Sequence, residues 1–393
     1  METSEGRPDA VALLHGAVWR AASLLSRVAF LALIVPRTSP GDFGVFFSYS
    51  SLGLLFSRVA SLGAIDNLPI KIGGEPAAMR RAFVDLLPFL GLAVCSIVLA
   101  ALINGILAAT IAVGLSMASG LMLAGAVRSV SPAWFERWLN LHPICFLGLA
   151  LTLGSDISAR ELLLGQAIAI VASQVVLVSQ ALRLSSSNDR KPLVTWACRA
   201  QRLLSGGGTR MVSDVLNAAC TRAFAIGPVL LGGWALSDSL ALALALGEAA
   251  WTVGMILVHR NFSYYCSAGA DLRHSLRSAS VLLTAMGVCG AAAAVVISLC
   301  RGVPMVERLE PDTLMAAIGL FAGITALWEL RYFDLAAGEK LQPWLTGQLF
   351  FLAAAATAPV LFGEVTAVWL IAAVTTVASV WLIVSRSLVV RAQ

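Results

Sequence analysis

The chain is a series of long apolar stretches separated by short polar ones. A helix needs roughly 20 apolar residues to cross the hydrocarbon core of a bilayer, and twelve stretches meet this requirement. They span residues 10–35, 43–67, 82–103, 106–129, 132–154, 161–183, 209–232, 235–258, 278–300, 312–335, 343–362 and 365–386. The fifth is the least regular, because Glu136, Arg137 and His142 lie in its first half. The pattern predicts an all-α integral membrane protein with about twelve transmembrane helices.

The composition supports this prediction. Hydrophobic residues make up 59% of the 393 residues and charged residues only 12%, with a mean hydropathy of +0.85. A soluble domain is nearer half apolar and a quarter charged. The net charge of +5 is explained by topology and contact with anionic lipids, so we expect no nucleic-acid partner. The seven cysteines form no CxxC motif or His/Cys cluster, which argues against a disulfide framework and a metal site.

The basic residues predict the orientation of the chain. Most of the 27 lysines and arginines lie on the side of the two termini, and few lie in loops on the opposite side. Those few are Arg37, Arg160, Arg301 and Arg308. The positive-inside rule therefore places both termini in the cytoplasm. The outer loops are too short for a soluble catalytic domain, so we expect a protein that is not an enzyme and acts inside the membrane.

A polar, basic segment divides the chain near its midpoint. It contains the sequence SSSNDRK and predicts a cytoplasmic linker over residues 184–208. The flanking parts, residues 1–183 and 209–393, are then two six-helix bundles. Because six is an even number, both bundles have the same orientation in the membrane, as in transporters built from parallel repeats.

A short sequence match supports the internal repeat. LLHGAVWR at residues 13–20 reappears as LLSGGGTR at residues 203–210, and each copy opens one half. The same offset relates Arg58 in the second span to Glu248 in the eighth. The two halves are therefore expected to form a parallel pseudo-repeat.

Apart from the arginines near the cytoplasmic ends of helices, four arginines lie within predicted spans: Arg20, Arg27, Arg58 and Arg222. Each costs about 2.5–3.5 kcal/mol at the bilayer centre on insertion scales, so a lipid-facing position is unfavourable. Arg20 and Arg27 are seven residues apart and share one helix face. Guanidinium groups bind phosphate and carboxylate bidentately. We therefore expect a cationic inner cavity that contacts a diphosphate or an acidic glycan, with structural charge pairing as the alternative.

Carboxylates in or near the spans are candidates for charge pairing or for coupling to H⁺ or Na⁺. Glu248 is the best candidate for coupling, but a structural ion pair with Arg58 or Arg222 explains it equally well. Asp66 lies two turns after Arg58 and is its expected partner, unless a carboxylate of another helix takes that place.

Further charges recur at helical spacing in the second half. Asp214 lies four residues after Arg210 and is most simply its ion-pair partner. Glu329, Arg331 and Asp334 lie near the cytoplasmic end of the tenth span and are expected to form an interfacial charge network.

The first two spans also resemble a known family. An arginine in the first helix is followed by IVPRTSPGDFGVFFSYSSLGLLFSRVASLG at residues 34–63, in which an outer turn with a proline precedes Asp-Phe-Gly. This order resembles the opening of lipid-linked oligosaccharide flippases of the Wzx type, within the multidrug/oligosaccharidyl-lipid/polysaccharide exporter superfamily. Two six-helix halves extend the resemblance to the architecture of the whole chain.

The resemblance implies a V-shaped pair of bundles with a central cationic cavity and alternating access. The implied substrate is an undecaprenyl-diphosphate-linked oligosaccharide, moved from the cytoplasmic to the outer leaflet of a bacterial inner membrane for O-antigen, capsule or exopolysaccharide synthesis. Membrane lipids, a polysaccharide polymerase and glycosyltransferases are the implied partners, and no cofactor is expected. The chain departs from the group in its short length and in SPAWFERWLNLHPICF at residues 131–146.

Two other functions remain open from the sequence. A drug/cation antiporter of the same superfamily would prefer an acidic, aromatic cavity, whereas here intramembrane arginines outnumber clear intramembrane carboxylates. A membrane scaffold that recruits glycan-assembly enzymes would need the arginines for stability but would transport nothing.

Overall fold

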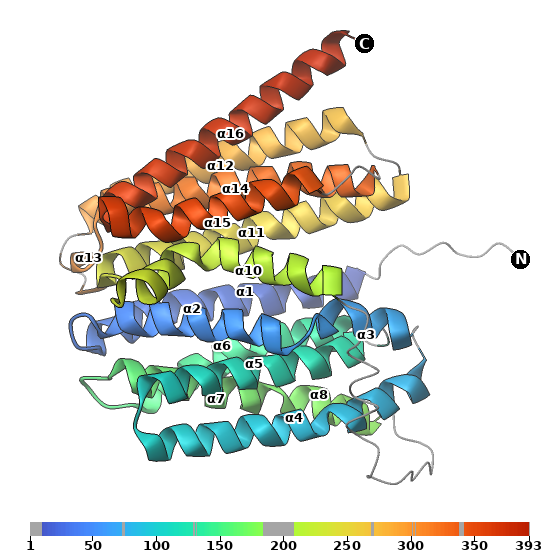
Figure 1. Cartoon of the computed structure of the whole chain (residues 1–393), viewed down its shortest axis with the longest axis vertical. Coiled ribbons are helices and arrows are strands. Elements are labelled where there is room, and N and C mark those ends of the chain that lie inside the picture. Colours follow the sequence, from blue (N-terminus) through green and yellow to red (C-terminus); the bar gives the residue numbers. More distant parts are fainter. Residues whose placement is uncertain are drawn as a thin grey trace, which may run out of the picture. The chain divides into compact units, whose positions relative to one another are not determined.

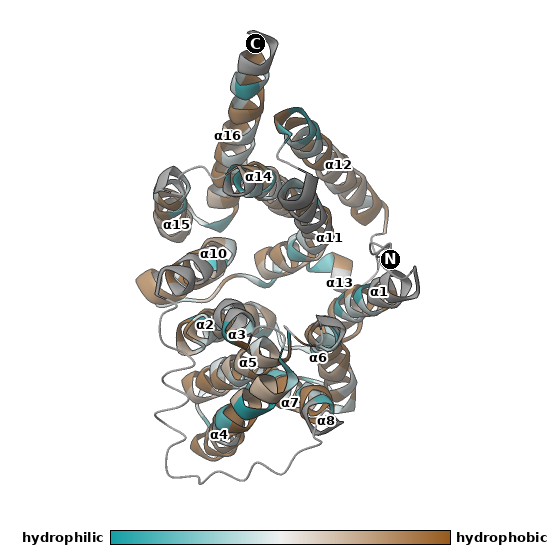
Figure 2. Ribbon diagram, turned by 90° about the vertical axis from the view of Figure 1, so that its right-hand side faces the viewer, coloured by the Kyte–Doolittle hydropathy of each residue, from teal (hydrophilic) through white to brown (hydrophobic). Residues whose placement is uncertain are grey.

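The computed structural model describes residues 10–72, 75–128, 130, 132–183, 208–268, 271–300, 302, 304–337 and 342–392. Within these ranges the chain is helical, apart from turns, an isolated backbone bridge between Thr38 and Ile157 and short irregular connections. Hydrophobic residues dominate the ribbons (Figure 2). The predicted all-α class is confirmed.

The helices follow the chain in order (Figure 1). In the first half they are α1 (Ala10–Leu33), the 3-10 turn η1 (Val35–Arg37), α2 (Asp42–Ala60), α3 (Ala64–Ile72), α4 (Pro76–Ile103), α5 (Ile106–Arg128), α6 (Pro132–Thr152), α7 (Ala159–Ser173) and α8 (Val175–Arg183). In the second half they are α10 (Gly208–Gly227), the π-helical turn η3 (Pro228–Gly232), α11 (Asp238–Ala268), α12 (Leu272–Leu299), α13 (Pro304–Glu307), α14 (Pro311–Ala336), α15 (Gln342–Phe362) and α16 (Glu364–Ala392).

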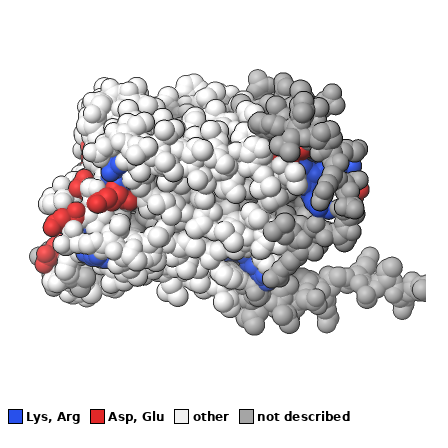
Figure 3. All heavy atoms as spheres, turned by 90° about the horizontal axis from the view of Figure 1, so that it is seen from below, with Lys and Arg blue, Asp and Glu red and all other residues white. Residues whose placement is uncertain are grey.

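Nine helical segments of the described chain are long and apolar enough to cross a membrane. The other three predicted spans fall on α6, on α10 together with η3, and on α11, so each of the twelve predicted segments is helical. On the face shown in Figure 3, acidic and basic side chains lie towards the two ends of the helices, and a broad band between those ends is uncharged. These features are those of a multi-pass membrane protein.

The chain forms two compact units, each with its own set of packed helices. One consists of residues 1–39 and 49–218, and the other of residues 40–48 and 219–393. Residues 40–48, which the sequence prediction assigns to the first half, thus pack with the second unit. The predicted linker 184–208 lies outside the described residues except for Gly208.

Each unit is built around one central helix. Among the nine candidate spans α5 and α14 are the most buried, and they are the fourth and the tenth predicted spans. In the first unit α5 packs against α4 and α7, the third and sixth spans. In the second unit α14 packs against α12 and α16, the ninth and twelfth spans. The same neighbours therefore recur in both units, as a six-helix repeat requires.

The outer helices repeat this arrangement. In the first unit α1 packs on α6, the first span on the fifth. In the second unit η3 packs on α15, the seventh span on the eleventh. Cys220 of α10 adds a hydrogen bond from its Sγ to the backbone oxygen of Gln348 in α15, at 3.3 Å.

Glycines allow the central helices to approach their neighbours closely. A Cβ on Gly114 of α5 would lie 2.4 Å from the Phe56 ring and 2.9 Å from the backbone oxygen of Gly53 in α2. A Cβ on Gly247 of α11 would lie 2.6 Å from the Phe321 ring of α14. Small residues at helix interfaces are typical of membrane proteins, where close van der Waals packing drives helix association.

The turn before α2 is held by a carboxylate of the second unit. Gly41 has a φ of +88°, and its N–H and that of Gly44 donate to Asp238 at 2.9 and 2.8 Å. Arg308 lies 3.6 Å from the same carboxylate. The Ser48 hydroxyl accepts from the N–H of Leu236 at 3.1 Å. These contacts explain why residues 40–48 belong to the second unit.

Candidate functional site

Arg20 and Arg27 lie on α1, in a stripe that also contains small polar side chains. Both arginines are half-buried. Ser23 and Ser26 are buried beside them, and the Ser26 hydroxyl donates to the backbone oxygen of Ala22 at 2.8 Å. The Ser26 hydroxyl is thus satisfied within its own helix, and the two guanidinium groups are the charged groups of this stripe.

The packing of α1 on α6 places a histidine near this stripe. The rings of Phe30 and Phe146 have centroids 4.6 Å apart and join the two helices. His142 of α6 lies within electrostatic range of Arg27. The Nδ1 atom of His142 is buried and has no hydrogen-bond partner among the described residues.

Arg58 lies in the last turn of α2 and is half-buried. The flanking hydroxyls are satisfied within the same helix, since Ser57 donates to the Leu54 oxygen at 2.6 Å and Ser61 to the Arg58 oxygen at 3.1 Å. The side chain of Asp66, its expected partner, lies outside the described residues.

Arg222 forms an ion pair with Glu248 inside the second unit. Nη2 of Arg222 in α10 lies 3.1 Å from Oε2 of Glu248 in α11, and the two side chains are 22% and 14% exposed. The sequence left Arg58 and Arg222 as alternative partners, and Arg222 takes this place. The side chain of Asp214 lies outside the described residues. Of the candidate arginines, Arg222 pairs with a carboxylate of the second unit, and Arg20, Arg27 and Arg58 lie on α1 and α2 of the first unit.

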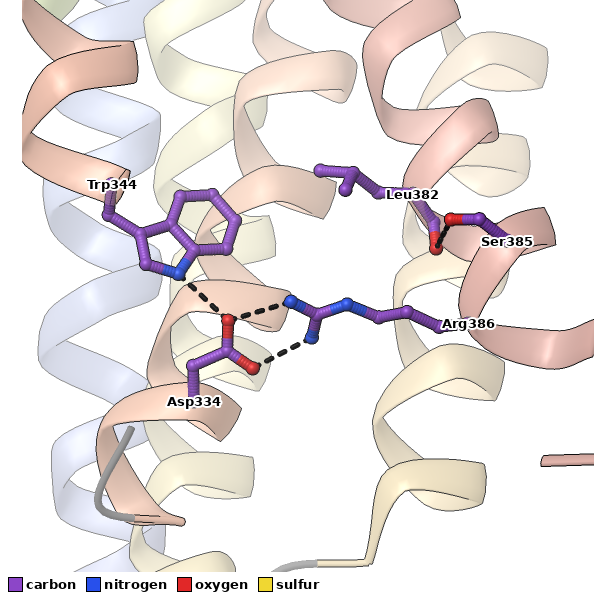
Figure 4. Close-up of polar contacts among 5 residues, drawn as sticks. All are labelled: Asp334, Trp344, Leu382, Ser385 and Arg386. Carbon is purple, nitrogen blue, oxygen red and sulfur yellow. Dashed lines mark hydrogen bonds and ion pairs between the residues drawn. The ribbon is translucent and has the colours of Figure 1, made fainter. Parts of the chain in front are cut away.

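The expected network of Glu329, Arg331 and Asp334 separates into independent contacts. Asp334 accepts two hydrogen bonds from Arg386 of α16 at 2.7 and 2.8 Å, and one from the Trp344 indole at 2.8 Å (Figure 4). This bidentate pair joins α14, α15 and α16.

The other two members of that set have different partners. The guanidinium of Arg331 lies 5.1 Å from the centre of the Trp328 ring, within the range of a cation–π contact. Glu329 is fully buried and accepts hydrogen bonds from Asn261 and Tyr265 of α11. Asn261 and Tyr265 are not among the site residues predicted from the sequence, although their spacing of four residues places both on one face of a helix.

A buried polar cluster also joins helices of the first unit. The Gln174 amide, at the junction of α7 and α8, donates to the Ser116 oxygen at 2.8 Å and to the Ser119 hydroxyl at 3.0 Å in α5. Among the described residues no group of three or more His, Cys, Asp or Glu is arranged to hold a metal ion.

No protein-family model and no curated protein matches the chain. Among solved structures, the chain is similar to the lipid II flippase MurJ in an inward closed conformation, with a TM-score of 0.59 and 10% identity over 96% of this chain and 87% of that one. The chain shares the fold of that flippase. A MATE structure in complex with MaD3S aligns over 95% of this chain and 92% of that one, with a TM-score of 0.34 and 14% identity.

Proposed function

We propose that this protein is a flippase of the multidrug/oligosaccharidyl-lipid/polysaccharide exporter superfamily. Its substrate would be an undecaprenyl-diphosphate-linked oligosaccharide, moved from the cytoplasmic to the outer leaflet of a bacterial inner membrane. The fold shared with a lipid II flippase over nearly the whole chain carries this proposal. The residues around the outer turn, which resemble Wzx-type flippases, support the choice of a surface-polysaccharide precursor.

The arginines of α1 supply the chemistry that such a substrate needs. A diphosphate offers several anionic oxygens, and planar guanidinium groups bind them with paired, charge-assisted hydrogen bonds. Arg20 and Arg27 are half-buried within an apolar span of hydropathy 1.7. We propose that they contact the diphosphate or an acidic sugar, with Arg58 next in importance. Arg222 is paired with Glu248, so it would contact the substrate only after this ion pair opened.

Alternating access would let the polar headgroup cross without meeting hydrocarbon, while the lipid tails stay in the bilayer. The membrane potential supplies about 2.3 kcal/mol per charge per 100 mV, and H⁺ or Na⁺ coupling would add to it. A polysaccharide polymerase and glycosyltransferases would be its partners in assembly.

Surface-glycan export in cells lacking the native protein tests the role of the arginines. Arg20→Ala and Arg27→Ala each remove a charge-assisted contact, and loss of about 1.5–3 kcal/mol corresponds to roughly a tenfold or greater decrease in export rate. Arg81→Ala is the matched control, because Arg81 on α4 is 59% exposed and its side chain lies 3.9 Å from Glu75.

Protein amount in the membrane is measured in parallel. Variants that insert at wild-type amounts and still support full export would overturn the role of Arg20 and Arg27. Cells that export surface glycan normally without the protein, and that gain cation-dependent drug resistance when it is added, would favour the antiporter instead.

A further inference from the structure

The second unit contains a buried glutamate on α14, a helix that carries none of the four candidate arginines. Glu329 of α14 is 0% exposed and forms no ion pair among the described residues. The ionisable side chain that acts on Glu329 electrostatically is that of His274, an exposed residue of α12. Of the charged groups on the helices packed around Glu329, Arg386 of α16 binds Asp334, Arg331 stacks on Trp328, and Arg273 and Arg277 of α12 are exposed.

The hydrogen bonds of Glu329 converge on one carboxyl oxygen. The Tyr265 hydroxyl donates to Oε1, and Asn261 Nδ2 donates to the same atom at 3.2 Å. Asn261 also donates to the Ser278 hydroxyl at 2.6 Å, which ties α11 to α12. The other oxygen, Oε2, is buried and has no hydrogen-bond partner among the described residues.

A second buried polar atom lies in the same cluster. The Ser275 hydroxyl, on a residue that is 0% exposed, has no hydrogen-bond partner in the described part of the chain and lies near the Tyr265 hydroxyl. The Tyr265 ring contacts the His274 ring edge-on, with centroids 5.9 Å apart. The cluster thus reaches from the buried carboxyl to an exposed, titratable side chain at the start of α12.

This arrangement fits a neutral carboxyl group. An ionised carboxylate buried without a cation is strongly unfavourable, and it would need donors at both oxygens. A protonated carboxyl has one oxygen that accepts and one that carries hydrogen. At Glu329 both donors reach Oε1, which leaves Oε2 as the place for the proton.

We propose that Glu329 is a proton-binding site of the second unit. A proton would bind Oε2 and leave towards His274 when the ends of α11 and α12 open to water. Resting on the proposed transport function, the site would couple lipid movement to the proton gradient. It differs from Glu248, whose carboxylate is already engaged by Arg222.

Infrared spectroscopy of the full-length protein in lipid vesicles tests proton binding without any transport assay. We expect a carbonyl band of a protonated carboxylic acid that disappears as the pH rises. Glu329→Gln should abolish this band. Asp334→Asn is the matched control, five residues away on the same helix, and should leave the band unchanged because the Asp334 carboxylate forms a bidentate ion pair with Arg386.

A second variant keeps the test informative if Glu329→Gln folds poorly. Tyr265→Phe removes one donor to the carboxylate, so the band should persist to higher pH. A band that Glu329→Gln leaves intact would overturn the proposal, as would a band that added Na⁺ removes at constant pH, which would indicate a cation site.

Coupling is measured separately in vesicles that contain labelled lipid-linked oligosaccharide. Wild-type transport should depend on pH, and Glu329→Gln should lose that dependence. A flat wild-type profile in the presence of the infrared band would contradict coupling. Absence of any transport would instead contradict the proposed flippase function, while the infrared result would still decide proton binding.

Discussion

The charged residues inside the helices serve different purposes, although they look alike in the sequence. Arg222 and Glu248 neutralise each other across α10 and α11, and Asp334 and Arg386 do the same across α14 and α16. Arg20 and Arg27 lie together on one stripe of α1 with buried serines. Ion pairing reduces the cost of burying charge, so the paired residues suit a structural role, whereas contact of the α1 arginines with substrate stays a prediction.

The Arg222–Glu248 pair is expected to stabilise the second unit. Glu248→Gln leaves the half-buried guanidinium without its carboxylate, which should destabilise the protein by about 1–3 kcal/mol. The double variant Arg222→Gln/Glu248→Gln should recover part of this loss, since both charges are then absent. Thermal unfolding in detergent measures both.

Transport by the double variant distinguishes a structural ion pair between Arg222 and Glu248 from a role of these residues in transport. A structural pair predicts that the stable double variant still transports. A double variant that is as stable as wild type but inactive would assign a transport role to Arg222 or Glu248 instead.

The turn before α2 contains the Asp-Phe-Gly motif that resembles Wzx-type flippases. The same turn packs so closely that it needs a glycine at position 44. A Cβ on Gly44 would lie 1.9 Å from the Leu236 backbone oxygen, so no side chain fits without moving the backbone. The contacts of Asp238 with Gly41 and Gly44 hold the start of α2 on α11. The Asp-Phe-Gly pattern thus has a structural explanation that is independent of any substrate.

Gly44→Ala should therefore destabilise the protein by about 1–3 kcal/mol, the usual cost of overpacking. Gly91→Ala is the matched control, because a Cβ on Gly91 in α4 meets nothing within 4 Å. Thermal unfolding in detergent should show a lower midpoint for Gly44→Ala only. Equal midpoints for the two variants would show that the turn tolerates a side chain.

At the scale of the whole molecule, the sequence predicts the class and the helical segments well. Each of the twelve apolar stretches is helical, because a bilayer requires long apolar helices with satisfied backbone groups. The repeat predicted from an eight-residue match reappears in the packing, where α5 and α14 have corresponding neighbours.

Tertiary contacts could be predicted less well from the sequence. Residues 40–48 follow the first span, yet Asp238 and Leu236 draw them into the second unit. The sequence could not decide which arginine pairs with Glu248. Helical spacing predicts the helix face on which a residue lies, but not which helix packs against that face. Asn261 and Tyr265 could not be predicted as site residues, because single polar residues in an apolar helix form no distinctive sequence pattern. Only the packing of α14 against α11 shows that both contact Glu329.

The predicted orientation of the chain in the membrane can be tested by labelling. Single cysteines placed at residue 190, in the predicted linker, and at residue 308, in a predicted outer loop, should react with a membrane-impermeant reagent from opposite sides of the membrane. Residue 190 should react only in inside-out vesicles. Labelling of both positions from the same side would refute the predicted orientation.

The flippase proposal is tested most directly by the movement of a labelled undecaprenyl-diphosphate-linked oligosaccharide across vesicles that contain the purified protein. We predict that the wild type exposes the inner-leaflet substrate to an external glycan-specific probe much faster than protein-free vesicles. Arg20→Ala/Arg27→Ala should reduce this rate while Arg81→Ala leaves it unchanged. A wild-type rate no faster than that of protein-free vesicles would contradict the proposed function.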